Sequence, residues 1–202
     1  MRVTDLRFGV GMNLKLPILL TCALYGWCLP AYSAQTETEC DSFAETPLHI
    51  KKGPQVKTSG RVPHVQIGVK PNKEINDTLF ELAYALPQLE KHPTIVSLAG
   101  SMGMWLEKDV PVKHPKAIVR GREFAHIHTD GSLHAPLPFE RALELEKKGW
   151  GERHPWADQK DGWEGLVMLY SATTNEELKT LIQLITESYN YVTGRNTPIP
   201  GC

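Results

Sequence analysis

An amphipathic segment near the C-terminus is the feature that most constrains the fold of this chain. Apolar residues recur there at helical spacing, at positions 178, 181, 182, 185, 189 and 192. The segment opens with the capping-box pattern Thr174-Asn-Glu-Glu177, and Gly194 follows it as a helix-ending residue. A helix with such a stripe has to cover an apolar surface, so we expect a helix from the Thr174 cap to Gly194 that packs into the core.

Other apolar patterns predict two more helices and several strands. A helix over 75–86 ends at Pro87, and another begins at Pro138 and stops at Gly149. Alternating or apolar runs predict strands at 65–69, 94–99, 102–106, 117–128, 132–137 and 163–171. Because these strands form hairpins rather than regular βαβ units, the pattern favours a single α+β domain. We expect a mostly antiparallel sheet covered by two to three helices.

The N-terminal segment has the pattern of a targeting sequence. Basic residues precede an uncharged run over 16–36, with small residues near positions 33 and 34. One interpretation is a secretory signal peptide at 1–34, which predicts an exported protein, periplasmic or secreted. The alternative is an uncleaved membrane anchor at 16–34. A loop-rich lead-in at 35–60, a domain at 61–195 and a C-terminal tail at 196–202 follow.

Charge and cysteine content narrow the classes of partner. The 202 residues include 22 Lys and Arg and 23 Asp and Glu, for a formal net charge of −1. No basic stripe is visible, which argues against a nucleic-acid partner. Beyond residue 34 only Cys40 and Cys202 remain. In an oxidising compartment they could form a disulfide that closes nearly the whole chain; the alternative is two unpaired terminal thiols.

Half of the histidines fall in the stretch from Arg122 to Trp156. On a strand, Arg122, Phe124, His126 and His128 share one face. The turn signal Thr129-Asp130-Gly131 leaves two registers open. A two-residue loop pairs Ile127 with His134 and puts that histidine on the opposite face.

A three-residue loop with Gly131 at positive φ pairs His126 with His134 instead, with their Cβ atoms about 5 Å apart. His154 could complete the cluster from beyond the helix that starts at Pro138.

Such a cluster has three possible roles. It could hold a divalent metal ion through His126, His128 and His154, since imidazoles are ligands for zinc, iron or copper. It could act without metal as a general base or an anion-binding group. It could also be purely structural. His134, Trp150, Glu152 and Trp156 are candidate substrate-binding residues, and Trp163 could also wall a pocket; core packing is the alternative for the tryptophans. The histidines at 49, 64, 92 and 114 are expected at the surface.

Several motifs resemble the fungal luciferase family. They are Arg122-Glu-Phe-Ala-His-Ile-His128, Ser132-Leu-His134-Ala-Pro-Leu, Lys147-Lys-Gly-Trp-Gly-Glu-Arg-His-Pro155, Leu169-Tyr-Ser with Asn175-Glu-Glu177, and Tyr191-Val-Thr-Gly194. The resemblance spans about residues 60–195 and is tightest over 122–157. The string Gly149-Trp-Gly-Glu-Arg-His-Pro155 is the most distinctive part.

This resemblance implies a monooxygenase-like reaction on a 3-hydroxy-6-styryl-2-pyranone. Molecular oxygen adds to the electron-rich ring, carbon dioxide is lost, and no ATP, flavin or added metal is required. A base would deprotonate the enol and a cation or donor would stabilise the oxyanion. We assign His126 or His154 as the base, with His128 nearby and Arg122 and Arg153 as oxyanion partners.

This chain also departs from the family. The fungal enzymes carry an N-terminal membrane segment and act inside the cell, whereas this chain has the pattern of an exported protein. Relatives of the domain also occur in organisms that emit no light. Light emission is therefore not implied. The alternative function is a non-catalytic exported module that binds a metal ion or a small anion through its histidines.

Overall fold

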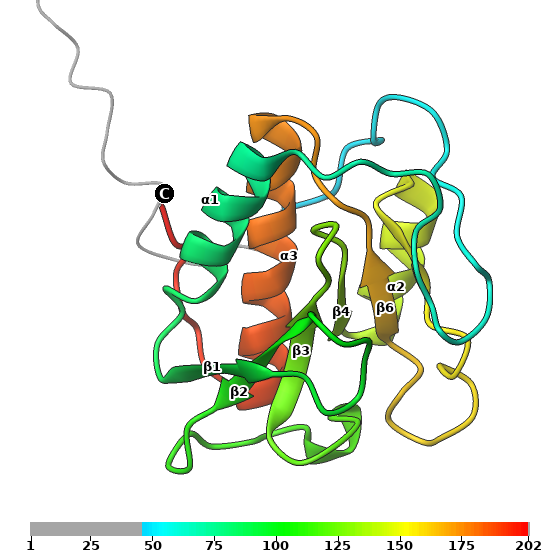
Figure 1. The fold of residues 1–202 in the computed structure, drawn as a ribbon. Coiled ribbons are helices and arrows are strands. Elements are labelled where there is room, and N and C mark those ends of the chain that lie inside the picture. Colours follow the sequence, from blue (N-terminus) through cyan, green and yellow to red (C-terminus); the bar gives the residue numbers. More distant parts are fainter. Residues whose placement is uncertain (1–45, 202) are drawn as a thin grey trace, which may run out of the picture. The chain divides into compact units, whose positions relative to one another are not determined.

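A six-stranded antiparallel sheet and three helices form the fold of residues 46–201, which are the residues that the computed structural model describes (Figure 1). The strands follow the spatial order β1-β2-β3-β4-β6-β5. The elements are α1 (Lys73–Ala83), β1 (Leu89–Pro93), β2 (Met102–Leu106), η1 (Pro115–Ala117, a 3₁₀ turn), β3 (Glu123–Ile127), β4 (Leu133–Pro136), α2 (Phe139–Lys148), β5 (Gly151–Arg153), β6 (Leu166–Leu169) and α3 (Asn175–Thr193). The expected α+β class with a mostly antiparallel sheet is confirmed.

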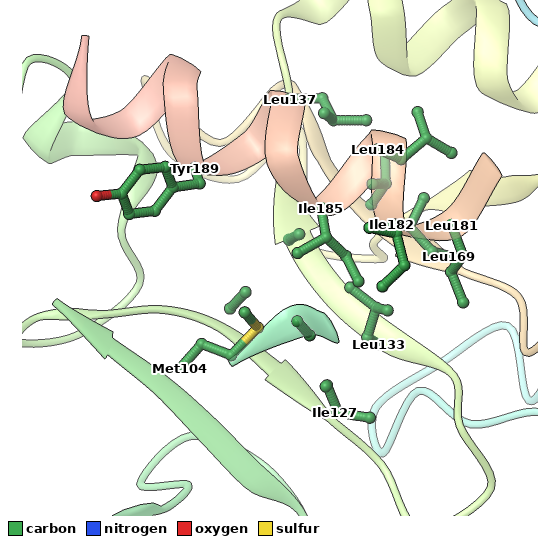
Figure 2. Close-up of a cluster of buried hydrophobic side chains, with 14 of the residues drawn as sticks. Met104, Ile127, Leu133, Leu137, Leu169, Leu181, Ile182, Leu184, Ile185 and Tyr189 are labelled. Carbon is green, nitrogen blue, oxygen red and sulfur yellow. The ribbon is translucent and has the colours of Figure 1, made fainter. Parts of the chain in front are cut away.

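Helix α3 covers one face of the sheet and forms most of the core with it. Its stripe, including Leu181, Ile185 and Tyr189, points at apolar side chains of the strands, among them Ile127 and Leu133 (Figure 2). The Thr174 hydroxyl accepts the Glu177 backbone N–H at the start, and Gly194 ends the helix at φ +74°. The prediction of a buried helix between these two caps is confirmed, and α1 lies beside α3 (Figure 1).

The turn between β3 and β4 has three residues. Gly131 adopts φ +83°, and the His128 N–H donates to the Ser132 carbonyl at 2.8 Å. His126 therefore pairs with His134, and Ile127 pairs with Leu133. Of the two registers that the sequence left open, the structure adopts the one with both histidines on the same face.

The alternation of side chains gives the sheet one apolar and one polar face. Leu133 and Ala135 of β4 lie in the core under α3, whereas His134 points to the opposite face. Across the strands His134 is level with Met168 of β6, and Met168 is level with Glu152 of β5. One cross-strand row thus places His126, His134 and Glu152 on the face away from α3.

A β-bulge in β3 changes the expected alternation. Met104 pairs with Ala125 and Trp105 pairs with Glu123, so Phe124 is the extra residue. Phe124 packs in the core against Tyr189, with ring centroids 6.0 Å apart. The bulge returns Glu123 to the polar face, where it is buried next to His126. The single face expected for Arg122, Phe124, His126 and His128 is therefore wrong.

Two predicted strands are loops. Residues 65–69 contain only a bridge between Gln66 and Thr58, and Gly68 interrupts the segment at φ +74°. The period of two is present, but the polar residues face inward, because His64 and Gln66 are buried while Ile67 is 55% exposed. The run 94–99 is a loop that follows β1. The apolar pattern of the sequence reveals neither β1 nor β5. Both have mixed or polar sequences at the sheet edges.

Several predictions concern residues outside the described part of the chain. These are the signal peptide or anchor and the Cys40–Cys202 disulfide, and they stay predictions. Within residues 46–201, the helices are all too short or too polar to cross a bilayer.

Substitution of Gly131 should destabilise the fold more than substitution of Gly68. Both glycines have positive φ, but a Cβ at Gly131 would lie 2.2 Å from Oδ1 of the buried Asn76, whereas one at Gly68 meets nothing within 4 Å. We expect Gly68→Ala to cost about 1 kcal/mol of unfolding free energy and Gly131→Ala about 3 kcal/mol. Urea denaturation measures both; equal losses would contradict the register described here.

Candidate functional site

Five histidines converge on the polar face of the sheet. His126 and His134 come from β3 and β4, His128 follows β3, His154 follows β5, and His64 comes from the loop before α1. The ring of His134 lies at the centre, with its centroid 4.8 to 5.2 Å from those of the other four. The expected cluster of His126, His128, His134 and His154 is therefore formed.

His64 is the member that the sequence analysis placed wrongly. It was expected at the surface, but it is 3% exposed and contacts both His134 and Glu152. Its loop is anchored by Gln66, whose side chain exchanges two hydrogen bonds with Ser171. The alternation of His64 and Gln66 with apolar residues is the signal in the sequence that could have found it. In the structure the polar face of this alternation is buried.

A continuous chain of side chains runs through the cluster from one carboxylate to another. Glu152 Oε1 lies 2.6 Å from His64 Nε2, and His64 Nδ1 lies 3.1 Å from His134 Nε2. His134 Nδ1 lies 3.0 Å from His126 Nε2, and His126 Nδ1 lies 3.2 Å from Glu123 Oε1. Three imidazoles are thus joined end to end between two carboxylates.

Both carboxylates are held in the ionised form. Burial alone would raise the pKa of Glu152, but hydrogen bonds from Thr58, His64 and Tyr170 outweigh burial and lower that pKa. The pKa of Glu123 is lowered in the same way, against burial, by hydrogen bonds from His126 and from the loop after β1. An ionised carboxylate only accepts hydrogen bonds, so the nitrogen of His64 that faces Glu152 and the nitrogen of His126 that faces Glu123 must each carry a hydrogen.

This requirement leaves one of the contacts between the three linked imidazoles without a hydrogen. With N–H groups directed at Glu152 and Glu123, neutral His64 and neutral His126 each present a lone pair to His134. A neutral imidazole has only one N–H, so His134 can donate to one of these neighbours but not to both. One of the two short N···N contacts therefore needs an added proton or another cation.

Of the remaining histidines, His128 and His134 are buried and His154 is half-buried, and all three are neutral rings. Burial, followed by the electrostatic effect of the neighbouring His126, lowers the pKa of His128 to about 4. Burial and the neighbouring histidines hold the pKa of His134 well below its usual range. Burial and His64 lower the pKa of His154 to about 4. At neutral pH each of these three rings carries one hydrogen and one nitrogen lone pair, and the lone pair of His154 accepts the Trp156 backbone N–H.

A cavity of about 170 Å³ opens onto the cluster. Its polar lining consists of His64, Ser97, His126, His134 and His154. Its apolar lining consists of Val62, Pro63, Val96, Leu98, Val119, Trp156 and Leu166. The site is therefore a small apolar pocket with imidazoles on one side, which suits a compact, largely apolar ligand with one acidic or anionic group.

The loop that follows β1 covers the cluster. The Thr94 hydroxyl and the Ile95 backbone N–H donate to Glu123. Ser97 Oγ lies 3.1 Å from His128 Nε2. The apolar run that was predicted to be a strand at 94–99 thus forms part of the wall of the cavity.

Other expected site residues lie elsewhere. The Arg122 side chain donates to the carbonyls of Leu106, Glu107 and Val110. The Arg153 guanidinium contacts Asp158 and Glu146. The structure does not bring either arginine to the cavity.

The tryptophans and Glu152 differ in their placement. Trp150 is buried in the core, with its indole N–H donating to the His49 carbonyl at 2.7 Å. Trp156 lines the cavity, and Trp163 stacks on it at 6.3 Å. Glu152 acts through His64 rather than at the cavity surface.

Metal-ligand geometry is present in two groups of histidines among the described residues. One group is His64, His134 and His154; the other is His126, His128 and His134. In each group the ligand nitrogens lie within 4.8 Å of one another, so either could hold a metal ion. The trio His126, His128 and His154 that the sequence suggested does not appear among these groups.

Comparisons with known proteins single out the same part of the chain. Residues 121–188 match the Luciferase domain family, and this segment includes every member of the cluster except His64. The chain is 32% identical to a luciferase of Armillaria gallica over 116 residues, or 54% of this chain and 42% of the relative.

Two other relatives give a similar result. A luciferase of Armillaria ostoyae is 29% identical over 168 residues, or 72% of this chain and 61% of the relative. One of Neonothopanus nambi is 36% identical over 79 residues, 36% and 28% of the two chains. The chain thus spans less than two thirds of the length of these relatives. No solved structure matches it.

Acid should destabilise the metal-free protein through His128. Because its folded-state pKa is about 4 against an ordinary value of 6.5, the unfolded chain binds the proton first as the pH falls. The stabilisation is complete above pH 6.5 and is lost toward pH 4, by about 3 kcal/mol. Urea denaturation across this range, with a chelator present, measures the loss.

His128→Asn should make this pH dependence shallower, whereas His92→Asn, at an exposed position, should not change it. An unchanged slope in His128→Asn would show that His128 titrates normally in the folded protein.

Proposed function

Because this chain contains a fungal luciferase domain at residues 121–188 and is a distant homologue of the Armillaria and Neonothopanus luciferases over a segment, we propose that it is an oxygenase-type enzyme. Its substrates would be molecular oxygen and a small enolic compound such as a hydroxypyranone. Light emission is not part of the proposal. The observation that supports it most is a cavity that combines apolar walls with neutral, buried imidazoles.

The first step that this site suits is removal of the enol proton. The chain of imidazoles between Glu123 and Glu152 is one hydrogen short, and His126 and His134 line the cavity. A proton taken from the substrate at His126 Nε2 would complete the hydrogen bonds of the whole chain. Geometry thus favours His126 over His154 as the base.

His154 has the complementary role. Its Nδ1 accepts the Trp156 backbone N–H at 3.1 Å, so the hydrogen of the neutral ring is on Nε2. His154 lines the cavity and can therefore donate to the oxygen that becomes anionic. The resulting enolate is electron-rich enough to react with oxygen without a flavin or an external reductant.

The size of the cavity limits the substrate class. About 170 Å³ is below the roughly 300 Å³ at which drug-sized ligands are usually enclosed. The side chains of Val62 and Leu98, which line the cavity, are each more than 40% exposed and extend its apolar wall to the surface. A ring-sized head group with an apolar tail that reaches the surface fits this arrangement.

The test is oxygen consumption with a panel of hydroxypyranones and simple enols, together with release of carbon dioxide. We expect His126→Gln to lower kcat by at least about 100-fold, because it removes the accepting nitrogen. His154→Gln should lower kcat less, since an amide can still donate. His92→Gln, at an exposed position, is the matched control and should leave turnover unchanged.

A second candidate function is binding without turnover. The two buried histidine groups support a module that holds a metal ion or a small anion. Ligand binding by the wild-type protein without any oxygen uptake would favour this function over the oxygenase. Equal turnover by wild type and His126→Gln would contradict the assignment of the base.

A further inference from the structure

The missing hydrogen in the imidazole chain also points to a cation of a different kind. We propose that His126, His128 and His134 form a binding site for one divalent transition-metal ion, with His64 as a positioning residue outside the ligand shell. Both histidine groups with ligand geometry include His134, so the choice between them depends on where each ring carries its hydrogen.

Two of the three ligands have their hydrogens directed away from the site. His126 Nδ1 faces the carboxylate of Glu123 at 3.2 Å, which leaves the Nε2 lone pair free for a metal. His128 Nδ1 lies 2.9 Å from Ser132 Oγ, and that hydroxyl donates its own hydrogen to Asp130. The hydroxyl must then accept from His128, so the lone pair of His128 is on Nε2, where a metal ion would take the place of the Ser97 hydroxyl at 3.1 Å.

The third ligand is set by His64. His64 Nε2 donates to Glu152, so its Nδ1 lone pair can accept the Nε2 hydrogen of His134, which is the tautomer of His134 that the proposal assigns. The Nδ1 lone pair of His134 then faces Nε2 of His126 at 3.0 Å. In that contact two nitrogen lone pairs face and repel each other. A metal ion bound by both nitrogens would remove this repulsion.

The arrangement around the three ligands is that of a metal site with a complete outer shell. The N–H of each imidazole is linked by hydrogen bonds to a carboxylate. His126 contacts Glu123 directly, His128 is linked through Ser132 to Asp130, and His134 is linked through His64 to Glu152. Such partners fix the tautomer and orientation of metal-binding histidines. Adjacent ligands at about 2.1 Å from a metal are about 3.0 to 3.4 Å apart, which agrees with the His126–His134 separation.

The other histidine group lacks this property. Because His154 Nδ1 accepts the Trp156 N–H, its neutral ring has the hydrogen on Nε2 and no lone pair to offer. This excludes His154 as a neutral ligand, both with His64 and His134 and in the trio with His126 and His128 predicted from spacing. His154 remains a hydrogen-bond donor beside the ion.

Three neutral imidazoles favour a borderline metal such as zinc, iron, nickel or copper over calcium or magnesium. His126 and His134 line the cavity, so an ion between them is reached from it. The inference does not rest on the oxygenase proposal: the ion and a substrate-derived proton are alternative occupants of the same contact. In the loaded protein the ion, and not His126, would meet the anionic oxygen.

Metal titration without substrate tests the site. The 202-residue protein, freed of metal with a chelator, is titrated with Co²⁺ and with Zn²⁺ at about pH 7.5, because protons compete with metal ions for imidazole nitrogens. We expect one equivalent per chain and visible ligand-field absorption with Co²⁺. His126→Gln and His128→Gln should each weaken binding at least about 100-fold, and His64→Gln about 10- to 100-fold.

His154→Gln and the exposed control His92→Gln should stay within about threefold of wild type by the same reasoning. Loss of binding in His154→Gln, two equivalents per chain, or no binding by folded wild type would each overturn the proposal. Oxygen uptake by the metal-free protein is measured separately and does not depend on metal binding. The metal site and the oxygenase proposal can therefore fail independently of each other.

Nitrogen-15 NMR of the wild-type histidine side chains provides a second test that needs no variant. The Zn²⁺-loaded protein should carry hydrogens on Nδ1 of His126 and His128 and on Nε2 of His134. A hydrogen on Nδ1 of His134 in that sample would overturn the site.

Discussion

The three-residue turn between β3 and β4 sets the register on which both faces of the sheet depend. It pairs His126 with His134 and Ile127 with Leu133. Because side chains alternate along a strand, this one register places Ile127 and Leu133 beneath α3 and both histidines on the other side. A shift of one residue in either strand would place a histidine in the apolar core and an apolar side chain in the site. The positive φ of Gly131 therefore supports the packing of α3 and the geometry of the cluster together.

Two carboxylates, the buried Glu123 and the half-buried Glu152, then set the hydrogen-bond pattern of the polar face. Glu123 reaches it only because the bulge at Phe124 reverses the alternation, and Glu152 reaches it from the edge strand β5. Each accepts hydrogen bonds that keep it ionised, and each directs an imidazole lone pair toward His134. A buried polar network of this kind stabilises the fold only when every contact has its hydrogen. The contact that lacks one is the observation on which both the proposed enol deprotonation and the proposed metal site depend.

Local sequence patterns predicted the parts of this fold whose burial follows their own periodicity. The stripe of α3 was found in this way, while capping and turn residues marked the ends of α3, the ends of α2 to within one residue, and the turn at Gly131, whose register the sequence left open. The motif around residues 122–157 also predicted the similarity to the Luciferase domain family, which matches residues 121–188, and it contains four of the five clustered histidines. The strand predicted at 65–69 is wrong because the polar Gln66 is buried there and the apolar Ile67 is exposed. Periodicity reveals an alternation but not which side of it meets the rest of the protein.

The sequence by itself therefore determined the fold class, the position of the core helix and the stretch of chain that holds the site. Only the tertiary structure decided which side chains complete that site. His64 and Glu152 are 88 residues apart and meet because the loop before α1 folds over the edge of the sheet. Arg122 and Arg153 lie close to the histidines in sequence, yet each finds hydrogen-bond partners elsewhere. Hydrogen counts and lone-pair directions depend on such long-range contacts, which spacing along the chain does not contain.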